Sequence, residues 1–98
     1  MLDGCTPFPE ALARLYRDKG YWEQRTFGAM LDDTAARFPE NPAVVDARQR
    51  LSYAELREAV NRAALWFLEF GIGSNDRVVV QLPNWVENVI LRMAFLKA

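Results

Sequence analysis

The stretch Arg50-Leu51-Ser52-Tyr53-Ala54-Glu55-Leu56 opens the longest amphipathic run of the chain. The Ser52 hydroxyl can accept the backbone N–H three residues on, and the Glu55 carboxylate can reach back to the Ser52 N–H, which together make a capping box. The apolar positions that follow recur at helical spacing until Gly71, which offers a left-handed stop: Leu56, Ala59, Val60, Ala63, Ala64 and Phe67. The sequence therefore predicts a long capped helix here.

This helix carries more apolar surface than a surface helix needs. Trp66, Leu68 and Phe70 widen its apolar arc to roughly 200°, beyond the stripe that faces a single core. We therefore expect strands before and after it to pack on more than one side. Taken alone, the stretch is a core helix, because it holds no nucleophile, metal ligand or phosphate cradle.

An arm and a short helix precede this region. Residues 1–8 are expected to form the arm, and a helix is expected from Pro9 to about Lys19, with Gly20 as its stop. Tyr21 and Trp22 follow outside any periodic run. We interpret them as a hydrophobic clamp that docks this helix on a larger body, in preference to a ligand-stacking pair.

A second helix and a hairpin lead into the long helix. Thr26 is the expected cap of a helix that ends near Phe38, where two prolines bracket a turn. Ala43 to Asp46 is a short apolar strand signal, a polar turn follows, and Leu51 begins the return strand. The sequence therefore predicts a short β-hairpin.

Beyond the long helix, the run Val78 to Leu82 is β-branched and continuous. Such a run is typical of a strand buried on both faces, so we expect a central strand and a parallel strand–helix–strand unit. In the turn before it, Asn75 tolerates a left-handed conformation, and Asp76 is expected to bond turn amides through its carboxylate.

A last helix is expected after this strand. Asn84 and Glu87 form a capping signal, and one face of the helix is apolar: Val86, Val89, Ile90, Met93 and Ala94. The loop Gln81 to Asn84 follows the carboxyl end of the expected strand, where ligands bind in parallel sheets. Simple helix capping is the favoured reading of this loop.

Composition limits the function of the chain. Its 98 residues make at most one small domain, and its net charge of −1 comes from interspersed charges without a basic stripe, so no nucleic acid or anionic membrane partner is expected. The apolar runs are too short to span a bilayer. Met1 to Gly4 lacks the charged and apolar segments of a secretory signal.

Catalytic residue types are scarce. The chain has no histidine, and its one cysteine, Cys5, excludes an internal disulfide and has no histidine to activate it. Gly71-Ile72-Gly73 is followed by neither a third spaced glycine nor Gly-Lys-Ser/Thr, so it is no phosphate loop. The sequence therefore predicts no catalytic, cofactor-binding or metal-binding residue within residues 1–98.

Three stretches carry a family resemblance. Leu51-Ser52-Tyr53-Ala54-Glu55-Leu56 resembles the first core motif of the adenylate-forming (AMP-binding) enzymes, Phe38 to Val45 resembles their helix, proline turn and buried strand, and Leu96-Lys97-Ala98 resembles the start of their second core motif. That superfamily includes acyl-CoA synthetases, aryl-acid–AMP ligases and peptide-synthetase adenylation domains. Glu10 to Trp22 is similar to the N-terminal extension of aryl-acid–AMP ligases such as 2,3-dihydroxybenzoate–AMP ligase.

The chain also departs from the family pattern. Ala47 stands where the family often has glycine, so we expect a longer, more open hairpin loop. Ser74 and Asn75 replace the proline and glycine that usually precede the aspartate of the next turn. The turn can survive with Asn75 in a left-handed conformation at some strain.

The resemblance implies a mixed α/β fold, with residues 1–25 as an N-terminal extension containing one helix and residues 26–98 as the incomplete start of the AMP-binding large domain. Intact members activate a carboxylic acid with ATP and magnesium and then transfer the acyl group to coenzyme A or a phosphopantetheinyl carrier protein. The expected parent is a cytoplasmic aryl-acid ligase of siderophore assembly. The chain itself is expected to bind no cofactor and to contact the remainder of that domain.

Two alternatives remain open. The parent can instead be an acyl-CoA synthetase for a cyclic, aromatic or medium-chain acid. From a different class, the chain can be a finished non-catalytic module that docks on a partner through its long helix, an interpretation motivated by the wide apolar arc of that helix.

Overall fold

The computed structural model describes residues 3–98, and its longest element is helix α3 (Tyr53–Phe70). The predicted capping box is confirmed: Ser52 Oγ accepts the Glu55 N–H at 3.2 Å, and Glu55 Oε1 accepts the Ser52 N–H at 3.0 Å. Gly71 ends the helix with φ of 101°, a left-handed conformation that favours glycine. The stretch that opens α3 therefore behaves as its residue types predict.

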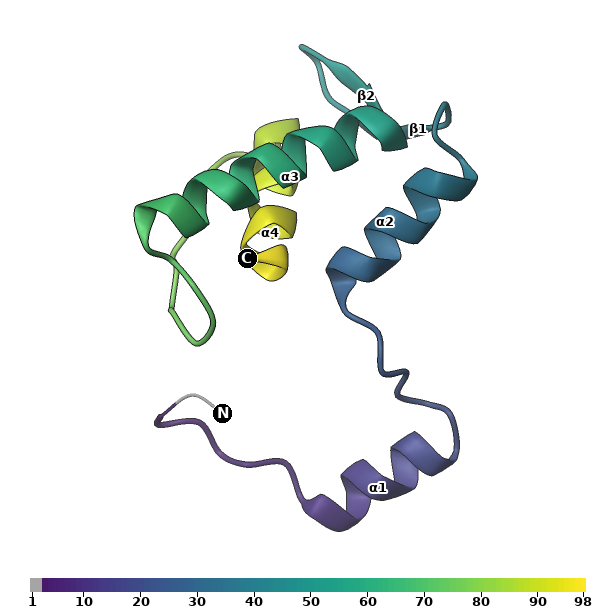
Figure 1. Cartoon of the computed structure of the whole chain (residues 1–98), viewed down its shortest axis with the longest axis vertical. Coiled ribbons are helices and arrows are strands. Elements are labelled where there is room, and N and C mark those ends of the chain that lie inside the picture. The colour runs from purple at the N-terminus through teal and green to yellow at the C-terminus, as the bar shows by residue number, and fades with distance from the viewer. Residues whose placement is uncertain (1–2) are drawn as a thin grey trace.

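The other elements follow the chain in the order shown in Figure 1. Their bounds are α1 (Glu10–Asp18), α2 (Phe27–Arg37), β1 (Pro42–Val45), β2 (Arg50–Ser52) and α4 (Val86–Lys97). Thr26 caps α2 by accepting the Ala29 N–H at 3.0 Å, as expected. Both the mixed helix–strand class and the first three helices thus match the sequence-based expectations.

Strands β1 and β2 form the predicted hairpin. They pair antiparallel, with Val45 opposite Arg50 and an irregularity in the register between Pro42 and Val44. The connection is a four-residue loop, longer than a tight two-residue turn, as the absence of glycine at Ala47 predicted. Asp46 Oδ1 accepts the Arg48 and Gln49 N–H groups at 2.8 Å each and so closes the loop.

The core lies where α2, α3 and α4 meet. The buried side chains of this cluster are Leu31, Leu56, Val60, Ala64, Phe67 and Ala94. Phe67 stacks on Phe95 with ring centroids 4.1 Å apart, which joins the C-terminal half of α3 to α4. Each helix contributes the side chains that its 3.6-residue period places on one face, so the three helices share one apolar centre.

Helix α1 lies apart from the other helices (Figure 1). The radius of gyration is 15.8 Å, against about 13 Å for a compact domain of this size. Trp22 packs on Phe8 and Tyr16, with centroids 4.8 and 5.3 Å away, while Tyr21 is 69% exposed. The aromatic clamp therefore closes on the N-terminal arm, and its docking on a larger body stays a prediction. Residues 1 and 2 of that arm lie outside the described residues.

The expected strand at Val78 to Leu82 is absent, which corrects one prediction. This segment runs from the turn after α3 toward α4 without forming a strand, and Val79 is 94% exposed. The only sheet among residues 3–98 is the β1–β2 hairpin, so the expected parallel unit does not form either. The physical reason is that a strand needs a neighbour, and no other stretch in this part of the chain pairs with it.

Among the described residues, none of the helices has the length and apolar character that a membrane-spanning helix needs.

Candidate functional site

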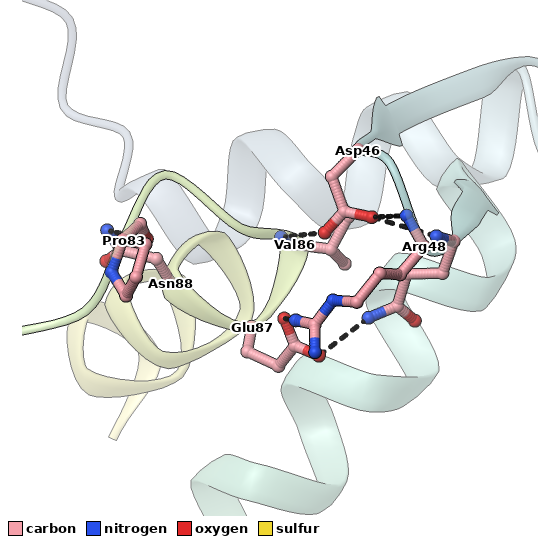
Figure 2. Close-up of polar contacts among 7 residues, drawn as sticks. Asp46, Arg48, Pro83, Val86, Glu87 and Asn88 are labelled. Carbon is pink, nitrogen blue, oxygen red and sulfur yellow. Dashed lines mark hydrogen bonds and ion pairs between the residues drawn. The ribbon is translucent and has the colours of Figure 1, made fainter.

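A connected group of polar side chains lies between the hairpin loop and the start of α4. While Asp46 Oδ1 holds the loop amides, its other oxygen, Oδ2, accepts the Val86 N–H at 2.9 Å (Figure 2). Three backbone hydrogen bonds to one half-buried carboxylate stabilise its ionised form. The Val86 N–H, followed by those of Arg48 and Gln49, therefore lowers the pKa of Asp46 from its ordinary value.

A second carboxylate strengthens the same junction. Glu87 accepts hydrogen bonds from Arg48 Nη2 at 3.0 Å and from Gln49 Nε2 at 2.9 Å. The Arg48 guanidinium also lies over the Trp85 ring, 4.1 Å from its centroid, within cation–π range. In Figure 2, the Asp46 side chain extends from the hairpin loop toward α4, and the Glu87 side chain extends from α4 toward the hairpin loop. We call this set, Asp46, Arg48, Gln49, Trp85 and Glu87, the hairpin latch.

The latch overturns the expected cap of α4. The residue at the N-cap position is Trp85, and no side chain caps the helix locally. The Asn84–Glu87 capping box does not form because Glu87 turns toward Arg48 and Gln49, and the free Val86 N–H is taken by Asp46. A capping carboxylate supplied from 40 residues away leaves no spacing signal in the sequence, so it could not have been predicted.

The loop Gln81 to Asn84 shows no catalytic arrangement. All four residues are exposed, and Asn88 Nδ2 donates to the Pro83 carbonyl at 3.3 Å (Figure 2). Asn84 borders a shallow hollow of about 220 Å³ that is otherwise lined by apolar side chains and Trp85: Val44, Val45, Val86 and Val89. A ligand role, the less favoured interpretation of this loop, stays a hypothesis.

A larger open groove of about 460 Å³ lies between the segment after α3 and helix α4. Its apolar lining includes Ile72, Val80 and Phe95, and its polar lining includes Asp76 and Arg92. Asp76 Oδ2 accepts the Gly73 N–H at 2.8 Å, so its expected role in bonding turn amides is confirmed. Arg92 is likewise held, because its Nε donates to Asn88 Oδ1 at 2.9 Å. Asn75 has φ of 70°, the left-handed conformation expected for it.

Lys97 ties three helices together. Its Nζ donates to Asp32 Oδ1 of α2 at 2.7 Å and to Asn61 Oδ1 of α3, and its side chain is 23% exposed. Its stem lies so close to Gly28 that a Cβ there would be 3.1 Å from Lys97 Cγ. Sequence reasoning noted Lys97 only as part of a motif and missed this structural role.

The remaining candidates for a chemical site are metal-ligating clusters and the single cysteine. Within residues 3–98, no group of three or more histidine, cysteine, aspartate or glutamate side chains could hold a metal ion, and Cys5 is an exposed free thiol. The prediction that residues 1–98 hold no catalytic, cofactor or metal residue is untested by these observations and stays a prediction.

Comparison with known proteins supplies the family. The model of the family described as "AMP-binding enzyme" matches residues 31–98. The chain is 43% identical, over 99% of its length, to a salicyl-AMP ligase / salicyl-S-ArCP synthetase of Mycobacterium tuberculosis. It is 45% identical, over 86% of its length, to a 2,3-dihydroxybenzoate-AMP ligase of Bacillus subtilis.

The structural comparison agrees with these matches. The apo structure of MbtA from Mycobacterium smegmatis superimposes with a TM-score of 0.91 at 41% sequence identity, over 97% of this chain and 18% of that chain. The chain likewise spans 18% of the Mycobacterium tuberculosis relative and 16% of the Bacillus subtilis relative. Because the family model covers more than two thirds of its residues, this chain belongs to the AMP-binding enzyme family.

Proposed function

We propose that this chain is the N-terminal segment of a ligase that activates an aryl acid with ATP. The carboxylate of the acid attacks the α-phosphorus of ATP, giving an acyl-adenylate and pyrophosphate, and a thiol then displaces AMP. The observation that carries the proposal is the 43% identity, over 99% of this chain, to a protein named as a salicyl-AMP ligase. Since two relatives are named for salicylate and 2,3-dihydroxybenzoate, a hydroxybenzoate is the proposed substrate class.

Within such a ligase we assign this segment a structural role. The hairpin latch and the Lys97 junction hold the hairpin, α2, α3 and α4 together, and no group of three or more metal-ligating side chains lies among the described residues. As part of the proposal, ATP and Mg²⁺ bind to residues of the parent protein outside this segment. The proposal includes the domain division, with residues 1–25 as an N-terminal extension and residues 26–98 as the start of the large domain. It also includes a cytoplasmic location for the protein.

ATP–pyrophosphate exchange by the full-length protein tests the reaction. We expect exchange with salicylate and 2,3-dihydroxybenzoate and none with octanoate. Exchange with aliphatic acids alone would remove the aryl-acid assignment and favour an acyl-CoA synthetase for other acids.

The thiol acceptor needs its own assay. One relative is named as a salicyl-S-ArCP synthetase, which supports a phosphopantetheinyl carrier protein as the acceptor. Incubating the full-length protein with ATP, the acid and either coenzyme A or a carrier protein whose phosphopantetheine thiol is free distinguishes the two acceptors. A thioester on coenzyme A alone would assign the protein to the acyl-CoA synthetases.

The alternative of a finished docking module rests on the exposed apolar face of α3, where Trp66 is 57% and Phe70 is 72% exposed. Sequencing the gene beyond the codon for Ala98 separates the two proposals. A continuation into a glycine-rich Ser/Thr loop supports the ligase, and a stop codon at that point supports the module.

A further inference from the structure

Lysine is scarce in this chain. Its basic side chains are arginines except for Lys19 and Lys97. An arginine guanidinium stays protonated in proteins, whereas a lysine amine can lose its proton and act as a nucleophile toward an acyl group. Lys19 and Lys97 are therefore the two side chains of this segment that can form a stable amide.

Lys97 is enclosed by its neighbours. Its Nζ donates to Asp32 Oδ1 at 2.7 Å and to Asn61 Oδ1, its side chain is 23% exposed, and its stem lies beside Gly28 of α2. An amine attacks through its lone pair. To meet an acyl group, Lys97 would therefore have to give up both hydrogen bonds and turn away from α2 and α3.

Lys19 is open by comparison. It is the C-cap residue of α1, and residues 18–27 around it are all exposed. Its Nζ lies 6.0 Å from the centroid of the Tyr21 ring, at the outer limit of a cation–π contact, and Tyr21 itself is 69% exposed. Helix α1 also lies apart from the other helices (Figure 1). The Lys19 amine is therefore accessible to a reagent in solution.

We propose that Lys19 is a site of self-acylation, modified by the aryl-adenylate that the parent protein makes. This proposal rests on the proposed function, because the adenylate is the acyl donor. The Lys19 lone pair attacks the carbonyl carbon of the adenylate, the bond from that carbon to the phosphate oxygen breaks, and AMP leaves with the electron pair. The proton on the nitrogen passes to solvent, which leaves an aryl amide on Nζ.

The same reaction at Lys97 would damage the fold. An amide at Nζ carries no charge and keeps one N–H, so it could not hold both Asp32 and Asn61. The junction between α2, α3 and α4 would lose its ion pair. The shielding of Lys97 and the exposure of Lys19 together direct acylation to the N-terminal extension, away from that junction.

Peptide mass spectrometry of the full-length protein tests the self-acylation. The protein is incubated with ATP, Mg²⁺ and salicylate without a thiol acceptor, and hydroxylamine then removes thioesters, including any at the exposed thiol of Cys5. We expect the salicyl amide on Lys19 to be at least about 10-fold more abundant than that on Lys97. Lys19→Arg should lose the modification and keep its pyrophosphate exchange. Pyrophosphate exchange without an amide on Lys19 would overturn the proposal.

An activated ester separates amine reactivity from the proposed function. The N-hydroxysuccinimide ester of salicylic acid needs no ATP, and we expect it to acylate Lys19 at least about 10-fold faster than Lys97 in the native full-length protein. In denaturant the two rates should be similar. Equal rates in the native protein would overturn the proposal. In a protein without pyrophosphate exchange, the proposed function and self-acylation both fail, while the ester still reports whether Lys19 is the open amine.

Replacing Asp32 tests the shield on Lys97. Asp32→Ala is expected to raise ester labelling of Lys97 about five-fold, because Nζ loses one charged acceptor. Asp33→Ala is the matched control, since the neighbouring carboxylate pairs with Arg25 and Arg37. Equal labelling of Lys97 in the two variants would show that Asp32 does not shield it and would overturn this part of the proposal.

Discussion

The Asp46 carboxylate lies in the hairpin loop, and it accepts the first free backbone N–H of α4, that of Val86, at 2.9 Å. A helix N-terminus carries unsatisfied N–H groups and partial positive charge, which an anion stabilises. Here the anion comes from another element, so hairpin closure and the start of α4 depend on the same side chain. Position 46 consequently controls two elements that are far apart in the sequence.

Replacing Asp46 tests this dependence. We expect Asp46→Ala to speed amide exchange at Arg48, Gln49 and Val86 together, because all three N–H groups lose one acceptor. Native-state exchange of the full-length protein measures the effect. Asp33→Ala is the matched control, since Asp33 makes exposed ion pairs, 3.6 Å long, with Arg25 and Arg37. Unchanged exchange at Val86 in Asp46→Ala would show that the latch does not hold α4.

Acid should weaken the junctions made by Asp46 and Glu55. Backbone hydrogen bonds lower the pKa of both groups, that of Asp46 chiefly through Val86 and that of Glu55 chiefly through Ser52. Because the folded-state pKa values are depressed, this stabilisation is fully present above the unfolded pKa of about 4. It is lost as the pH falls through the folded-state values. Carboxyl NMR titration of the segmentally labelled protein measures both groups, and a pKa at or above the ordinary value contradicts the geometry.

Local signals in the sequence predicted the elements that depend on neighbouring residues. Three of these features are hydrogen bonds between groups a few residues apart: the capping box of α3, the Thr26 cap and the Asp76 turn. The left-handed conformation of Asn75 is likewise local, and spacing and residue type predicted all four. These are the positions where one short stretch contains both partners of the interaction.

Two failures share the opposite cause. The cap of α4 was wrong because its carboxylate comes from Asp46, and the strand at Val78 to Leu82 was wrong because no other described stretch pairs with it. Residue pattern indicates how a segment can pair, whereas its partner is a property of the tertiary structure. The structural role of Lys97 could not be predicted for the same reason, because its partners Asp32 and Asn61 lie on two other helices.

Removing the Ser52 hydroxyl should loosen the start of α3. Ser52→Ala is expected to cost about 1 kcal/mol, the usual effect of losing an N-cap side chain, and to raise exchange of the Glu55 amide about five-fold. Ser52→Thr is the control, because threonine keeps a hydroxyl that can accept the Glu55 N–H. Equally fast exchange of the Glu55 amide in the alanine and threonine variants would show that the hydroxyl contributes nothing.

The close contact between Gly28 and Lys97 predicts a coupled pair of substitutions. Alanine is favoured over glycine by roughly 0.5–1 kcal/mol in the middle of a helix, which is an upper limit for Gly28 in the first turn of α2. At position 28 alanine would also crowd a Lys97 stem that is fixed at its end by Asp32. We therefore expect Gly28→Ala to be nearly neutral alone and stabilising when Lys97→Ala is already present. Urea unfolding of the four full-length proteins of this double-mutant cycle measures the difference. Additive effects would show that Lys97 yields without strain.

The isolated 98-residue chain should be inactive and only marginally stable. It leaves Trp66, Phe70 and Val79 largely exposed, and each large apolar side chain kept in water forgoes roughly 1.5–3 kcal/mol of burial. That is a sizeable share of the about 5–15 kcal/mol that stabilises an ordinary domain. We expect binding of a dye specific for apolar surface, a broad thermal transition, aggregation at modest concentration and no pyrophosphate exchange. A soluble monomer that unfolds in one sharp transition without binding the dye would show that this chain buries its own core and needs no further partner.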